Sequence, residues 1–211
     1  MKHLLWATNL ATAVILSGCL AAPKELSITP AAEVSATGVG GGRSIGVSCL
    51  DSRPERQGGI AAGSFVLDPD ADVAGALCRA TADGLARMGF VPAIGAAAGG
   101  AQLRVEMVRI AHAVGAGNLK RAVEVEAELR ATAAGASGQY TTTYRAQRMR
   151  EVAFSPRKET VQALSDETVS AALSRVLADP QILARLGGGP VAPSAPAPAV
   201  NSTDTQTFPY P

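Results

Sequence analysis

Residues 123–129 read Val-Glu-Val-Glu-Ala-Glu-Leu, and this strict alternation of apolar and acidic side chains decides the fold. Successive side chains of a β-strand point to opposite faces of its sheet, so one face is buried here and the other is wet. Residues 103–107 and 140–145 alternate in the same way. One wet face is typical of antiparallel sheets. The three stretches therefore predict an antiparallel meander with glycine-rich turns at 115–118 and 134–138.

Upstream of the meander the sequence predicts a strand followed by a helix. Residues 44–50 place apolar side chains at every second position, which is typical of a strand inside a sheet. Residues 70–88 repeat apolar and small side chains at three- and four-residue spacings, as a helix with one buried side does. Asp68 or Asp70 can cap this helix, and Gly89 is the expected residue after its end.

A short edge strand at 90–93 and a final helix complete the predicted fold. The final helix follows Pro156, and Asp179 can cap a short terminal helix that begins at Pro180. The prediction is an α+β fold. Its four- to five-stranded, mainly antiparallel sheet has two helices packed on one face, in the order β-α-β-β-β-β-α.

The amino terminus has the pattern of a lipoprotein signal. Lys2 supplies positive charge, residues 10–16 are apolar, and Leu-Ser-Gly at 16–18 precedes Cys19. This is a lipobox, at which a peptidase cuts before the cysteine. The apolar run is shorter than the roughly 20 residues that cross a membrane. Cys19 is therefore the predicted lipidation site, and a covalent diacylglycerol and an N-acyl chain on it are the only non-protein groups that we expect.

The lipobox also predicts location and domain boundaries. Two or three acyl chains hold a protein stably on a membrane, whereas one chain binds only marginally. Leu20 rather than an aspartate follows the cysteine, which favours the periplasmic face of the outer membrane, with the inner membrane as the alternative. The predicted segments are a signal peptide (1–18), a lipidated flexible tether (19–43), one α+β domain (44–186) and a disordered Pro/Ala-rich tail (187–211).

Charge and histidine content argue against nucleic-acid binding and catalysis. The chain has 19 basic and 18 acidic residues, and loss of residues 1–18 removes only Lys2, which leaves 18 against 18. A nearly neutral chain lacks the basic surface that phosphates require. His3 is removed with the signal peptide, so His112 is the one histidine that remains. A zinc site with several imidazole ligands or a Ser-His-Asp site would therefore lack residues that it needs. The Gly-rich segment 38–43 precedes a strand, unlike a dinucleotide loop. We expect no enzyme, cofactor or metal.

Two cysteines remain after Cys19 is acylated. Cys49 lies in the first predicted strand and Cys78 in the first predicted helix. These elements should pack together in an oxidising compartment, so a disulfide is possible. Two buried free thiols in an alanine-rich core are the equal alternative.

Three glutamates share the wet face of residues 123–129. They could bind a cation, but cross-strand charge compensation is the favoured interpretation. The arginines of the next strand that could lie opposite are Arg145, Arg148 and Arg150.

Several segments together resemble the YajG-type family of bacterial lipoproteins. These are the lipobox at Cys19, Ser-Ile-Thr-Pro at 27–30, the strand end at 47–53 and the helix tail at 177–180, within a likeness that spans 16–186. The resemblance implies an envelope lipoprotein and offers no active residues. We expect a non-enzymatic accessory role with an envelope protein as partner. The alternative is an auxiliary of an envelope transport system that binds a lipid or amphiphile in a groove beside the alanine-rich helix.

Overall fold

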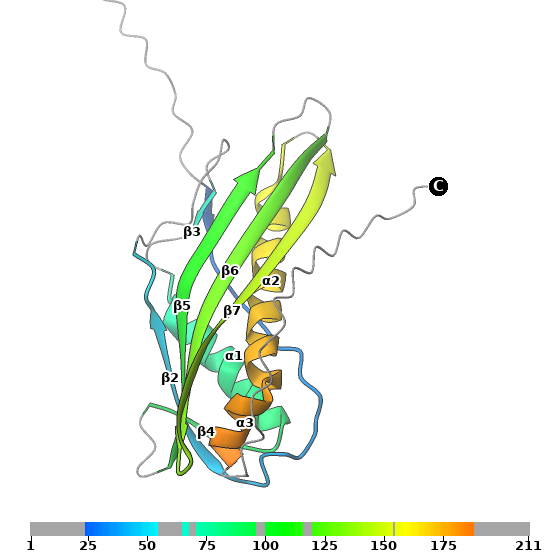
Figure 1. Ribbon diagram of the computed structural model, residues 1–211. Coiled ribbons are helices and arrows are strands. Elements are labelled where there is room, and N and C mark those ends of the chain that lie inside the picture. The colour runs from blue at the N-terminus through cyan, green and yellow to red at the C-terminus, as the bar shows by residue number, and fades with distance from the viewer. Residues whose placement is uncertain are drawn as a thin grey trace, which may run out of the picture.

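The computed structural model describes residues 24–54, 65–67, 71–95, 100–115, 120–153 and 155–187. They form a five-stranded sheet with helices on one face and a two-stranded sheet beside it (Figure 1). The strands are β1 (Lys24–Leu26), β2 (Ser44–Asp51), β3 (Phe65–Leu67), β4 (Val91–Ile94), β5 (Ala101–Val114), β6 (Lys120–Gly135) and β7 (Gly138–Ala153). The helices are α1 (Val73–Arg87), α2 (Lys158–Ala178) and α3 (Pro180–Gly187).

The predicted meander is confirmed in β5, β6 and β7. The three strands pair antiparallel, with Leu129 between Met107 and Tyr144. Gly138 has a φ of 101° where β7 begins, a conformation that suits glycine. Most of the predicted turn at 115–118 lies outside the described residues. The apolar positions of β6 are fully buried, namely Val123, Val125, Ala127, Leu129, Ala131 and Ala133.

The pairing of β2 corrects the predicted sheet. The predicted elements occur in the predicted order, with β1 and β3 as two further short strands that the sequence did not predict, but β2 lies between β4 and β5 and runs parallel to both. The sheet is therefore mixed, and "mainly antiparallel" is wrong for its β4-β2-β5 half. Helix α1 returns the chain across the sheet, so β4 starts at the same end as β2, and such helical crossovers give parallel neighbours.

Helix ends follow local sequence with one correction. Asp72 caps α1, accepting from the Gly75 N–H at 2.8 Å, while Asp68 and Asp70 lie outside the described residues. Gly89 has a φ of 88° after the helix, as expected of a residue that ends a helix. Asp179 caps α3 as predicted, accepting from the Gln181 N–H at 2.7 Å.

The predicted flexible tether is wrong for residues 24–43, which are ordered. Residues 27–33, which we call the strap, run extended along α2. The N–H groups of Ser27, Thr29, Ala31 and Glu33 donate to the side chains of Gln162, Asp166, Ser170 and Ser174 at 2.7–2.9 Å. The residues between them face inward, and Ile28 and Ala32 are 4% and 1% exposed.

The strap fits because two periodicities match. Two residues of a strand advance roughly 6.6 Å, and four residues of a helix advance roughly 6.0 Å. Side-chain acceptors at every fourth position of α2 therefore lie opposite every second N–H of the strap. They take the place of the carbonyl groups that a neighbouring strand would supply.

The strap and α2 pack against α1 at Gly84, on the helix beside which the sequence suggested a groove for an amphiphile. A Cβ atom on Gly84 of α1 would collide with Leu177 of α2 and lie 3.3 Å from the Cβ of Ala32. The small side chains of α1 thus admit the strap and α2 instead of leaving a groove.

Candidate functional site

Cys19 lies outside the described residues, so its lipidation stays a prediction. Among the helices of the described ranges, none is long and apolar enough to cross a membrane.

Cys49 and Cys78 form a disulfide in the structure. Their Cα atoms are 5.4 Å apart, and the bond joins β2 to α1 on the helix-covered face of the sheet. The sequence left open whether these cysteines form a disulfide or remain two free thiols, and the structure contains the disulfide. Its role there is a covalent link between two packed elements.

His112 is a residue of β5 whose side chain is buried against α2, with 6% of the residue's surface exposed. Its Nε2 is 2.9 Å from Ser165 Oγ, and that hydroxyl donates to the carbonyl oxygen of Val161 at 2.7 Å. A hydroxyl has one proton, so Ser165 accepts from His112, whose Nε2 carries the hydrogen. Burial, and to a lesser extent the positive charge of Arg53, lowers the pKa of His112 from 6.5 to about 4. The imidazole is therefore neutral at pH 7.

Arg53 is a buried charge that the sequence reading missed. Its side chain is 4% exposed, and its Nε and Nη2 donate to the Asp51 carboxylate at 2.7 and 2.6 Å. Within the described ranges, Arg53 Nη1 and His112 Nδ1 are buried without a hydrogen-bond partner. The available signal was an aspartate and an arginine two positions apart after an apolar strand, which equally indicates an ordinary polar strand end.

The geometry of His112 and Ser165 is that of a structural contact. A catalytic base must accept the proton of the hydroxyl that it activates. Here the Ser165 proton goes to Val161, and both side chains are buried. The pair instead ties the inner side of α2 to the sheet.

The other face of the main sheet is covered by no described element, and we call it the open face (Figure 1). A register shift between Met107 and Arg109 turns Arg109 toward it. The open face on β5, β6 and β7 includes Arg104, Glu106, Arg109, Glu124, Glu126, Glu128, Arg130, Thr132, Thr141, Thr143, Arg145, Gln147 and Met149.

Charge compensation on this face is confirmed, with a change of partners. Glu128 accepts from Arg145 at 3.0 Å and Glu126 pairs with Arg109 at 3.2 Å, while Gln147 donates to Glu124. The predicted partners Arg148 and Arg150 are wrong, because they lie opposite Val125 and Val123 and so share the covered face. No three His, Cys, Asp or Glu side chains gather as a metal site in the part of the chain that the structure describes.

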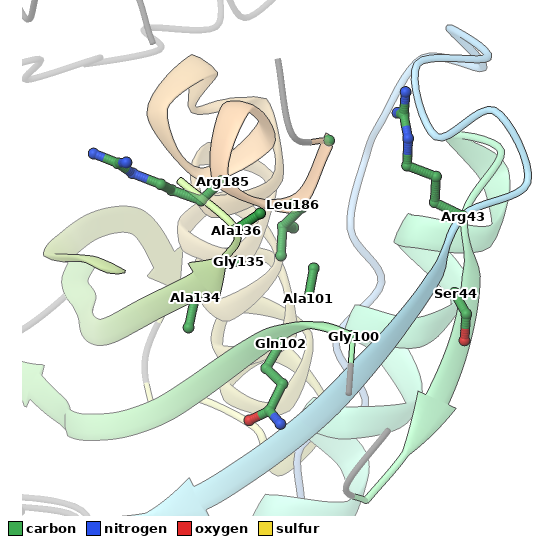
Figure 2. A pocket seen from close by; sticks show the side chains of 11 residues that line it. Arg43, Ser44, Gly100, Ala101, Gln102, Ala134, Gly135, Ala136, Arg185 and Leu186 are labelled. Carbon is green, nitrogen blue, oxygen red and sulfur yellow. The ribbon is translucent and has the colours of Figure 1, made fainter. Parts of the chain in front are cut away.

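A pocket of about 640 Å³ lies at the sheet end where β2 and β5 begin and α3 finishes (Figure 2). Ala101, Gly135 and Leu186 line it, and Arg43 and Arg185 flank it. Each arginine donates to a backbone carbonyl, and the two guanidinium groups do not converge, because that of Arg185 is directed away from Arg43 (Figure 2). The arrangement does not form a clamp for an anion.

These features define the class of protein: an α+β domain in which helices cover one face of a mixed sheet and the other face is open. The chain belongs to the YajG-type family of uncharacterised lipoproteins, whose family profile matches residues 30–186. This confirms the resemblance drawn from the sequence. No curated protein sequence matches the chain.

Solved structures of low sequence identity match this chain. Protein XCC0632 from Xanthomonas campestris, of family DUF330, is 15% identical, with 74% of this chain and 91% of that chain covered and a TM-score of 0.43. A putative neuraminyllactose-binding hemagglutinin homologue from Helicobacter pylori is 8% identical, with 76% and 96% covered and a TM-score of 0.44.

Proposed function

We propose that this lipoprotein is anchored through acylated Cys19 to the periplasmic face of the outer membrane and serves a non-enzymatic accessory role. In that role the open face contacts an envelope protein. Family membership supports the lipoprotein assignment. The observation that carries the contact surface is the open face itself, where charged side chains are held in cross-strand pairs on long strands.

The ordered strap supports a close attachment to the membrane. Four residues separate Cys19 from Lys24, where the described chain begins. An extended chain spans at most about 3.6 Å per residue, so the lipidated cysteine would lie within roughly 18 Å of Lys24. The open face is thereby confined to partners near that membrane.

Pre-set charged side chains suit protein recognition. Glu106 and Glu128 are 13% and 15% exposed and already paired with arginines. Their geometry is fixed before a partner arrives, which reduces the entropy cost of binding, and electrostatic complementarity then selects the partner.

The test is site-specific photo-crosslinking in living cells. A photoreactive residue at Thr141 or Gln147 on the open face should capture one discrete protein. The same residue at Asp83, which is exposed on α1, is the matched control and should not capture it. Equal capture from Asp83, or none from either face, would contradict the open face as the contact surface.

The anchor is tested separately. Cys19→Ser should move the protein from the membrane fraction to the soluble periplasm, and mass spectrometry of the native protein should find diacylglycerol and an N-acyl chain on Cys19. An unmodified cysteine in membrane-bound protein would overturn the anchor. Density-gradient separation of the two membranes then distinguishes outer from inner.

A further inference from the structure

We propose that His112, beside the buried charge of Arg53, is a pH-sensitive latch that holds the first half of α2, and with it the strap, on the sheet. The proposal is independent of the open face and of its partner. It rests on the buried hydrogen bond between β5 and α2 and on the buried ion pair at the end of β2.

The latch has an inner and an outer side on the same turns of α2. On the inner side, Ser165 accepts from His112 of β5. On the outer side, Gln162 and Asp166 accept from Ser27 and Thr29 of the strap. Displacing these turns would loosen the sheet contact and the strap together.

Protonation gives His112 a second N–H without an acceptor. Nδ1 is buried and has no partner within the described ranges, and Asp51 is already bidentate with Arg53. A buried unpaired donor with a positive charge is costly, so the charged form favours an opened state in which water reaches the ring.

The charges around His112 reinforce this preference. From the end of β2 come Arg53 and the one acid, Asp51. Strand β6 contributes Val125 and β7 contributes Arg148 in the same cross-strand row. Helix α2 contributes neutral Ser165, and the two acids that follow it are both engaged: Asp166 accepts from Thr29 of the strap, and Glu167 pairs with Arg150 of β7. An imidazolium here meets more positive than negative charge.

The size of the effect follows from linkage. The pKa of His112 is lowered from 6.5 to about 4 in the closed state, and an opened state would titrate near 6.5. Between these values the open state binds more protons, so the closed state loses stability as pH falls. From pH 7.5 to 4.5 the opening constant should rise roughly 70-fold.

Hydrogen exchange on the purified mature protein in detergent micelles tests the latch. After correction for intrinsic exchange rates, the opening constant of residues 27–33 and 161–166 should be roughly 70-fold higher at pH 4.5 than at pH 7.5. Opening of α1 should change only a few-fold. His112→Gln keeps a donor for Ser165 and removes the imidazole titration, so the strap and α2 of this variant should not show the roughly 70-fold rise. A rise caused by protonation of carboxylates would instead remain in the variant.

A second measurement holds even if the variant folds poorly. His112 is the one histidine of residues 19–211, so its ring gives a single NMR titration. A midpoint well below 6.5 in the folded protein supports the latch. A midpoint at or above 6.5, or equal exchange responses in α1 and α2, would overturn it.

Discussion

On the covered face of β6, Leu129 and its alternate neighbours are fully buried, whereas the open face of the same strand carries Glu124, Glu126, Glu128 and Arg130. Burial of an apolar side chain contributes about 1.5–3 kcal/mol, while an exposed ion pair contributes about 0–1 kcal/mol. The covered face therefore contributes most of the stability, and the open face contributes little. Four variants, one of them a double substitution, test how stability is distributed between these regions.

The largest loss should come from the covered face. Leu129→Ala leaves a cavity between the sheet and the helices and should lower the free energy of unfolding by about 4 kcal/mol. Urea unfolding followed by circular dichroism measures it. Thr132→Ala, on the open face of the same strand, is the control and should cost under about 1 kcal/mol. Equal losses of unfolding free energy in Leu129→Ala and Thr132→Ala would show that the two faces contribute equally to stability.

The disulfide on the covered face should rank next. Cys49→Ala with Cys78→Ala opens a link across 29 residues and should cost about 3 kcal/mol. Reduction of the native protein should lower its melting temperature similarly, and the double variant should not respond to reductant. Alkylation of both cysteines in unreduced, unfolded protein would show that the bond is absent in the cell-derived protein.

A smaller effect is expected where the strap meets α2. Asp166→Ala removes the acceptor of the Thr29 N–H and hydroxyl and should cost about 1 kcal/mol, because the site is exposed. Amide exchange of residues 27–33 should accelerate. Glu167→Ala, which loses only the pair with Arg150, should leave strap exchange unchanged. A strap that exchanges fast in the native protein would contradict its docking.

The smallest change in stability is expected on the open face. Glu128→Gln removes the pair with Arg145, whose side chain is 69% exposed, and should shift stability by less than about 1 kcal/mol. Crosslinking from Thr141 in this variant should nevertheless fall. A large loss of stability would mean that the open face supports the fold.

Burial of His112 shows where local sequence misleads. Positions 103, 105 and 107 of β5 face the core, so regular alternation would put residue 112 with Arg104 and Glu106 on the open face. The register shift after Met107 reverses this and turns His112 inward. By contrast, parity within β7 would have separated Arg148 and Arg150 from Arg145, because even and odd positions of a regular strand face opposite ways.

Local sequence was enough to predict the β5–β7 meander, the order of the main elements, the end of α1 at Gly89 and the cap at Asp179. These depend on periodicity and on hydrogen bonds between near neighbours, which a short stretch contains. The parallel position of β2, the docked strap and the contact of His112 with Ser165 on the inner side of α2 follow from tertiary structure alone. Each depends on groups far apart in the chain: the strap is ordered by acceptors about 135–141 positions later. No local pattern in residues 24–43 encodes those acceptors.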